Sequence, residues 1–92
     1  MRFDFKPSFA RSLKSFHVSD QEEIKEVAIE TIRILSRQET LSKGIGLKRL
    51  EDNYWEVRYG LKARILFRWQ NDYVEFVLAG DHEDIKRFLR NI

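Results

Sequence analysis

The stretch "YWEVRYGLKARILFRW", residues 54–69, predicts two β-strands joined by a tight turn. The side chains of a strand alternate between the two faces of its sheet, so each strand divides into two sets. One set is apolar and aromatic: Trp55, Val57, Tyr59, Ile65, Phe67 and Trp69. The other set carries the charges: Glu56, Arg58, Arg64 and Arg68. The stretch therefore predicts a hairpin with one core face and one face that gathers arginines.

The next residues predict a third strand. "YVEFVLAG", residues 73–80, is rich in strand-forming residues and follows the turn Asn71-Asp72. A two-residue turn brings apolar side chains opposite one another on one face. The expected pairs on that face are Trp69–Val74, Phe67–Phe76 and Ile65–Leu78. Those on the other face are Arg68–Glu75, Leu66–Val77 and Arg64–Ala79. For the first hairpin, a three-residue loop at 60–62 pairs Val57 with Ile65 and Arg58 with Arg64.

The flanking segments predict one further strand and the helices. Pro7 suits the first position of a helix, and Ser19 with Glu22 forms a capping box at the start of a longer one. Together with the hairpins this gives the order β-α-α-β-β-β-α, an α+β fold in which helices pack on one face of a small antiparallel sheet. The additional segments are a strand in "RFDFK" and helices over 7–16, 20–37 and 81–91.

Length and composition describe one globular domain, residues 1–92. The chain is 42% hydrophobic and 35% charged, with a mean hydropathy of −0.52, which argues against a membrane protein. No apolar run approaches the roughly 20 residues that a membrane-spanning helix needs. The opening "MRFDFKPSFA" lacks the apolar core and cleavage site of a signal peptide, so we expect a cytoplasmic protein.

The composition also excludes several kinds of chemistry. The chain has no cysteine, which excludes disulfides, thiolate catalysis and cysteine-ligated metals. Its two histidines, His17 and His82, are far apart and lack a metal-ligand spacing. We therefore expect neither a metal nor a cofactor.

We expect the arginine-rich face to bind an anion. Arg68 has Glu75 as its expected partner, but Arg64 lies between Arg58 and Ala79 in the predicted register, and like charges placed opposite each other destabilise a sheet. A carboxylate from another chain and a phosphate both match a guanidinium group. His82, just past the third strand, is expected near Arg64, where it is either an acid–base group or an ordinary residue at a helix start.

The ordered set of motifs resembles the RelE/ParE superfamily of bacterial type II toxin–antitoxin toxins. The pieces that carry the resemblance are a Leu-x-x-Leu, a "W-E-L-R"-like strand, an "R-I-L-Y"-like strand and a Gly-Asp-His before the last helix. They correspond here to 47–50, 55–58, 64–67 and 80–85, and the match spans roughly residues 45–86. The opening segment and the capped helix also occupy the family's places.

The resemblance implies one of two activities. RelE-like members are metal-independent endoribonucleases that cleave messenger RNA on the ribosome, where the 2′-OH of the RNA attacks the adjacent phosphate. ParE-like members inhibit DNA gyrase without catalysis, and a catalytically inactive relative that only binds an antitoxin is a third alternative. All are partners of a cognate antitoxin protein, so contact with DNA would be indirect, through that antitoxin.

The resemblance also implies site residues. Arg64 corresponds to the arginine that contacts the scissile phosphate, Arg58 to a basic position on the preceding strand, and His82 to the region of the catalytic Arg or His. Glu56 or Lys86 is the expected assisting group, and both depart from the family pattern: Lys86 replaces the usual tyrosine, and Glu56 stands where some nuclease members have a lysine. Contacts to ribosomal RNA phosphates are expected from Lys48, Arg49, Lys62, Arg87 and Arg90.

Overall fold

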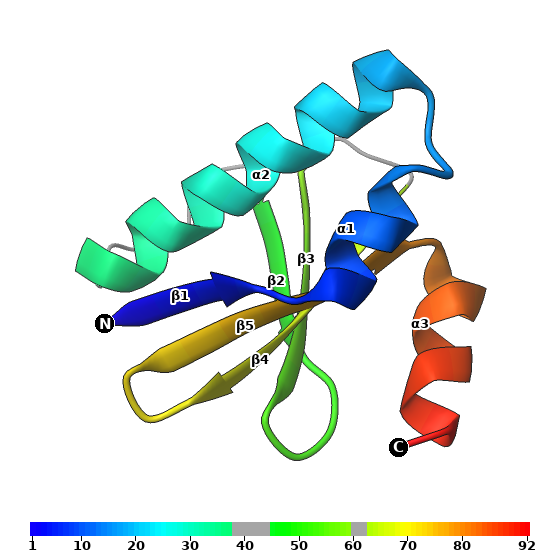
Figure 1. The fold of residues 1–92 in the computed structure, drawn as a ribbon. Helices are drawn as coiled ribbons and strands as arrows, with labels where there is room; N and C mark the ends of the chain where they lie inside the picture. Colours follow the sequence, from blue (N-terminus) through cyan, green and yellow to red (C-terminus); the bar gives the residue numbers. More distant parts are fainter. Residues whose placement is uncertain (38–44, 60–62) are drawn as a thin grey trace.

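A β-sheet with helices on both of its faces forms the centre of the fold (Figure 1). The computed structural model describes residues 1–37, 45–59 and 63–92. Across the sheet the strands follow the order β1-β5-β4-β3-β2. In chain order the elements are β1 (Arg2–Phe5), α1 (Pro7–Leu13), α2 (Val18–Arg37), β2 (Ile45–Arg49), β3 (Tyr54–Tyr59), β4 (Arg64–Gln70), β5 (Tyr73–Gly80) and α3 (His82–Arg90). The predicted α+β class is confirmed.

Strands β3, β4 and β5 form the predicted antiparallel meander, and β2 extends it. Residues 45–49 are not predicted as a strand, because glycine and lysine there weaken the strand signal. In the structure β2 pairs antiparallel with β3 and places Gly46 opposite Arg58 and Lys48 opposite Glu56. This extra strand gives the arginine-rich face a further basic edge.

Strand β1 makes the sheet mixed, whereas the sequence analysis expects antiparallel strands throughout. It pairs parallel with β5, with Arg2 opposite Tyr73 and Phe5 opposite Phe76. Tight hairpin turns connect antiparallel neighbours, but β1 and β5 are separated by most of the chain. No local turn therefore fixes their relative direction, and the hairpin patterns could not reveal it.

The register of β4 against β5 is as predicted next to the turn and shifts by one residue farther along. The confirmed pairs are Trp69–Val74, Arg68–Glu75 and Phe67–Phe76. A β-bulge follows between Phe67 and Leu66, and Val77 is the extra residue of β5. The predicted pairs beyond it are wrong, and the observed ones are Leu66–Leu78, Ile65–Ala79 and Arg64–Gly80. An inserted residue leaves no mark on a hydrophobic alternation pattern that fits either register.

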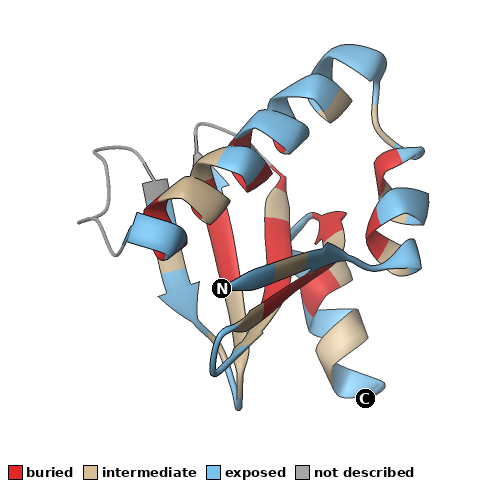
Figure 2. Cartoon of the chain, turned by 60° about the vertical axis from the view of Figure 1, so that its left-hand side comes forward, coloured by how far each residue is buried: buried red, intermediate tan, exposed pale blue. Residues whose placement is uncertain are grey.

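Helices α1 and α2 cover one face of the sheet and enclose the main core (Figure 2). The core contains Phe9 and Leu13 of α1. It also contains the expected strand residues and one face of α2: Val57, Ile65, Phe67, Val74, Phe76, Ile24, Val27, Ala28, Ile34 and Leu35. Ala79 lies in this core as well, because the shifted register of β5 turns it away from the arginine-rich face on which it was expected. Trp55 and Trp69 pack against this core with their ring centroids 5.4 Å apart, as predicted for packing residues.

The start of α2 differs from the prediction. The helix begins at Val18, and the Gln21 backbone N–H donates to the carbonyl oxygen of His17 at 2.9 Å. The ring Nδ1 of His17 lies 3.0 Å from the Ser19 hydroxyl. Ser19 is therefore inside the first turn, and the predicted capping box with Glu22 does not mark the helix start.

Helix α3 packs on the opposite face, so the expectation that all helices lie on one face is wrong. Its buried Ile85 contacts Leu66 and Val77, while Phe88 and Leu89 pack at the margin of this second cluster. Leu66 alternates with core residues along β4, so its side chain points away from α1 and α2. Leu66 and Val77 are apolar residues on the otherwise charged face, and the apolar side of α3 shields them from water.

Helix α1 completes the edge of β5 where β1 ends. The Ser8 hydroxyl donates to the Val77 carbonyl oxygen at 2.6 Å, and the Ser12 hydroxyl accepts the Ala79 backbone N–H at 2.9 Å. Side chains one helical turn apart thus replace the backbone groups of a neighbouring strand. This arrangement fixes the end of β5, from which α3 and the candidate site continue.

Candidate functional site

Three of the predicted site residues meet on the sheet face that α3 partly covers. A guanidinium nitrogen of Arg64, Nη1, lies 2.6 Å from Nδ1 of His82. The Nε of the same guanidinium lies 3.9 Å from an oxygen of the Glu56 carboxylate. The Glu56 residue is only 9% exposed, and the His82 contact lies at the surface. A single arginine therefore bridges a sheltered carboxylate and an exposed imidazole.

The contact determines which tautomer of His82 is present. A guanidinium group has only donors, so Nδ1 of His82 must accept the hydrogen bond. The proton of the neutral ring is then on Nε2. In this state Arg64 uses one donor on the histidine and keeps others for an external anion.

The positions of Arg64 and His82 in their elements explain why the two side chains are in contact. Arg64 is the first residue of β4 and lies opposite Gly80, the last residue of β5. Asp81 is the N-cap of α3, and His82 is the first residue of that helix. The sequence analysis expects His82 near Arg64, and the structure places the two in contact. The cap residue Asp81 is not among the predicted site residues. An acid at the N-cap followed three residues later by a second acid, here Asp84, is nevertheless a recognisable signal for the start of a helix.

Arg58 lies on the same strand as Glu56, two residues farther along. Its side chain is exposed and packs over Gly46 of β2, where an added Cβ would lie 3.3 Å from Cγ of Arg58. Among residues 1–37, 45–59 and 63–92 the Arg58 guanidinium has no ion pair or hydrogen bond. The described pairing of β3 with β4 ends at Val57–Ile65, so the expected Arg58–Arg64 pair stays a prediction.

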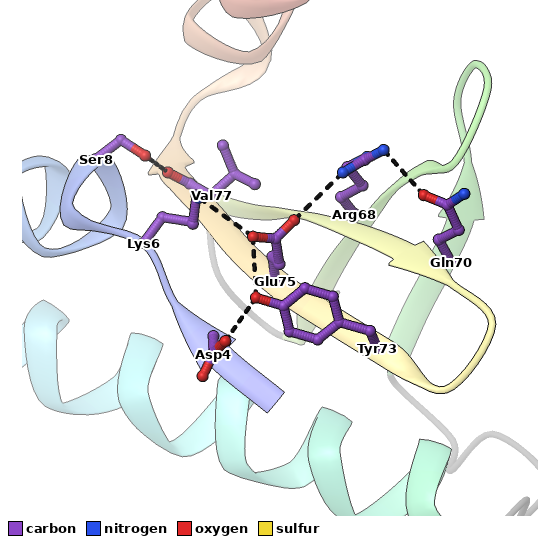
Figure 3. A network of polar contacts seen from close by, with 8 residues as sticks. All are labelled: Asp4, Lys6, Ser8, Arg68, Gln70, Tyr73, Glu75 and Val77. Carbon is purple, nitrogen blue, oxygen red and sulfur yellow. Dashed lines mark hydrogen bonds and ion pairs between the residues drawn. The ribbon is translucent and has the colours of Figure 1, made fainter. Parts of the chain in front are cut away.

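Arg68, the third arginine of this face, is held by its own network at the other end of the sheet (Figure 3). It lies 3.4 Å from Glu75, as predicted, and donates to the side chain of Gln70. Lys6 and the Tyr73 hydroxyl also contact Glu75. Burial alone would raise the pKa of the Glu75 carboxyl, but the hydrogen bonds from Lys6 and Tyr73 outweigh it and keep that pKa below its ordinary value. Arg68 is therefore satisfied within the sheet.

The Tyr73 hydroxyl links this network to β1. It donates to Asp4 at 2.5 Å and lies 3.1 Å from Glu75. The hydrogen bond to Asp4, then desolvation and the contact with Glu75, raise the pKa of Tyr73 to about 12. The tyrosine is thus a structural link between neighbouring strands, with its proton firmly bound.

The predicted cations of α3 line two separate cavities. Lys86 and Arg90 line a shallow cavity of about 330 Å³ with Glu51 and Leu89. Arg87 faces another cavity, of about 360 Å³, between α1 and α3, and pairs with Asp84 at 3.2 Å. The structure places no contact between Lys86 and the Arg64–His82 pair among the described residues.

The basic residues of β2 differ in their surroundings. Lys48 is exposed and lies opposite Glu56 in the sheet, next to the candidate site. Arg49 donates to the backbone carbonyl oxygen of Asp52 in the following turn. Lys62 lies outside the described residues. Of the five predicted RNA contacts, Lys48 is the one that the sheet register brings next to Glu56.

The donor set offers acid–base and anion-binding chemistry. Within the described parts of the chain no group of three or more His, Asp or Glu residues is arranged to hold a metal ion, and no helix has the length and hydropathy to cross a membrane. Arg64 provides a fork of donors for an oxyanion, His82 an imidazole and Glu56 a carboxylate. These groups suit transfer of a proton beside a bound phosphate.

Comparison with known proteins identifies the fold. No protein-family profile matches the sequence, and no curated protein is similar to it. Solved structures are similar over nearly the whole chain, and they include toxins and toxin–antitoxin complexes of the RelE type. The chain therefore has the α+β fold of RelE-type toxins, as the sequence motifs predict.

Three of these structures define the similarity. The RelB–RelE antitoxin–toxin complex from Methanococcus jannaschii has a TM-score of 0.67 at 21% identity, and the match covers 91% of this chain and 95% of that one. A metal-bound toxin from Helicobacter pylori has a TM-score of 0.69 at 12% identity, with 92% and 98% covered. The toxin–antitoxin complex RelBE2 from Mycobacterium tuberculosis has a TM-score of 0.63 at 18% identity, with 88% and 96% covered.

Proposed function

We propose that the protein is the toxin of a type II toxin–antitoxin system and that it acts as a metal-independent, ribosome-dependent mRNA endonuclease. The observation that carries this proposal is the contact of Arg64 with both His82 and Glu56 on the sheet face that α3 partly covers. The fold shared with RelE toxins and RelB–RelE complexes supports it, and the same likeness supports a cognate antitoxin as partner.

The proposed reaction uses each group in one role. Arg64 holds the scissile phosphate and stabilises the negative charge that develops on its oxygens. Glu56 accepts the proton of the attacking 2′-OH, and the oxygen forms a bond to phosphorus as the bond to the 5′-oxygen breaks. His82 gives a proton to that leaving oxygen. The products are a 2′,3′-cyclic phosphate and a 5′-hydroxyl end.

The contact with Arg64 prepares His82 for this role. Nδ1 accepts a hydrogen bond from Arg64, so the proton of the neutral ring is on Nε2. Arg64 has further donors and can bind the phosphate while it holds the ring. The Nε2 proton is then the one that His82 gives to the leaving oxygen.

The other basic residues have binding roles in this proposal. Lys48 and Arg58 lie on the two strands at Glu56, and Lys86 and Arg90 lie together on α3. Such cations contact phosphates without reading sequence. Their spread over several elements suits a large, highly charged surface such as ribosomal RNA.

The test is expression of the chain in a bacterium without an antitoxin, followed by primer extension on a reporter mRNA. We expect new 5′ ends within translated codons for the native chain and none for Arg64→Ala. Arg68→Ala is the matched control, because that arginine is on the same strand and face but is satisfied by Glu75. It should cleave like the native chain.

Two other outcomes would overturn the proposal in different directions. Growth arrest with intact mRNA and broken DNA would support a gyrase inhibitor. A soluble, folded chain that arrests nothing would support an inactive relative that only binds its antitoxin.

A further inference from the structure

Gly80 is in close contact with the start of α3. A Cβ added to this glycine would lie 2.7 Å from Cβ of Asp84 and 2.8 Å from its Oδ2. The backbone of Gly80 is not in the left-handed region, so the chain conformation does not itself require glycine. The missing side chain is needed because Asp84 occupies that space. Opposite Gly80 in the sheet lies Arg64, so this close contact is beside the candidate site.

Asp84 is held in that space by hydrogen bonds to the N-cap. Its carboxylate accepts the Asp81 backbone N–H at 3.0 Å, and its own N–H donates to the Asp81 side chain at 2.8 Å. The hydrogen bond from the Asp84 backbone lowers the pKa of Asp81, which remains ionised as a cap should. The two residues between these partners are His82 and Glu83. The reciprocal bonds therefore fix the turn on which the imidazole is placed.

We infer that Gly80 and Asp84 are positioning residues that hold His82 against Arg64. Gly80 leaves the space in which the Asp84 carboxylate closes the first turn of α3, and that turn sets where the His82 ring lies. Neither residue is assigned a contact with the RNA in the proposed reaction. The inference deepens the proposed function and rests on it for its consequence on cleavage, but its structural part stands on the contacts alone.

The exposure of His82 and of helix α3 explains why a hydrogen-bonded cap is needed at this turn. His82 is exposed, and within the described residues the hydrogen bond of its ring is the one to Arg64. Helix α3 has a single buried residue, Ile85, so packing alone anchors its first turn weakly. A hydrogen-bonded cap is a short-range constraint that packing does not provide there.

A first measurement tests the structural part without any assay of function. The ¹⁵N chemical shift of Nδ1 of His82 records whether that nitrogen accepts a hydrogen bond, and Arg64→Ala supplies the reference in which the donor is missing. At a pH of about 8, where an ordinary histidine is neutral, we expect the signals of Gly80→Ala and Asp84→Ala to move to the position seen in Arg64→Ala. His82→Gln assigns the signal against that of His17.

Asp84→Asn is the matched variant. It retains a carbonyl oxygen that can accept the Asp81 N–H, but it loses the charge and the ion pair with Arg87. We expect its Nδ1 signal to stay at the native position. A native signal in Asp84→Ala would overturn the inference, as would a shifted signal in Asp84→Asn, because the charge rather than the cap would then be responsible.

A second measurement tests the consequence for cleavage. We expect the single-turnover rate on saturating ribosomes to fall roughly tenfold to a hundredfold in Asp84→Ala, because a small misplacement of a catalytic group is costly. The affinity for ribosomes should stay unchanged, and Asp84→Asn should restore the rate. If Gly80→Ala fails to fold, the two Asp84 variants still decide the question, since that side chain is 45% exposed.

The two measurements distinguish a failure of the positioning role from a failure of the proposed function. A shifted Nδ1 signal with a native cleavage rate would leave the positioning role intact and remove His82 from the proposed reaction. A native Nδ1 signal with a reduced rate would overturn the positioning role. Absence of cleavage by the native chain would contradict the proposed function and leave the first measurement as the test of the contacts.

Discussion

The substitution Ser12→Ala tests how α1 completes the edge of β5. The Ser12 hydroxyl accepts the Ala79 N–H at 2.9 Å, and Ala79 is only 4% exposed. Loss of the acceptor leaves a buried donor unsatisfied, which costs about 1–3 kcal/mol. The cavity lined by Ser12 and Ala79 is open enough to admit water, so we expect the lower part of that range, about 1–2 kcal/mol. For a domain of this size the midpoint of thermal unfolding should fall by about 5–15 °C.

Urea-induced unfolding followed by tryptophan fluorescence measures the effect. Ser15→Ala is the control, because Ser15 lies in the turn directly after the same helix and its exposed hydroxyl only donates back to the Ser12 carbonyl. It should change the free energy of unfolding by less than about 0.5 kcal/mol. Equal stability of the two variants would refute the reasoning, since it would mean that the Ala79 N–H needs no partner from α1.

Further predictions concern the network, the second core and the turn. The raised pKa of Tyr73 stabilises the fold below pH 10.0, and this contribution is lost as the pH rises toward about 12, so Tyr73→Phe should flatten that part of the unfolding free-energy profile. Ile85→Ala should cost about 2–5 kcal/mol and speed amide hydrogen exchange in α3 first; exchange rising equally in α2 would contradict a separate cluster. Asn71 has a φ of 55°, so Asn71→Gly should be tolerated, whereas Asn71→Val should cost about 1–2 kcal/mol in thermal unfolding; equal midpoints would refute the strain.

The predictable part of the fold is the part that local patterns control. Alternation along residues 54–69 gives the two faces, and the turn at Asn71-Asp72 gives the register as far as Phe67. Beyond that point Val77 is inserted, and the alternating pattern fits both registers because its neighbours Leu78 and Ala79 are both apolar. A bulge depends on twist and packing that a pattern of residue types does not encode.

Long-range packing accounts for the other differences. The sequence predicts the helix α3, but which face of the sheet it covers depends on Leu66, one apolar residue among the charges. At the site, the spacing of His82 after the strand was enough to expect it near Arg64. The roles of Gly80 and Asp84 arise only from a contact across the start of a helix, which no single segment reveals.

The parallel pairing of β1 with β5 has a consequence for how the protein is made. Asp4 and Tyr73, which are joined across these strands, are 69 residues apart in sequence. A chain leaving the ribosome exposes β1 early and its partner much later, and pairings between distant segments form slowly because a long loop must close first. Arg64 and His82 belong to the same late portion of the chain. Closure of the sheet and assembly of the arginine–histidine pair are therefore late and nearly simultaneous events, and a nascent chain that ends before β5 has neither.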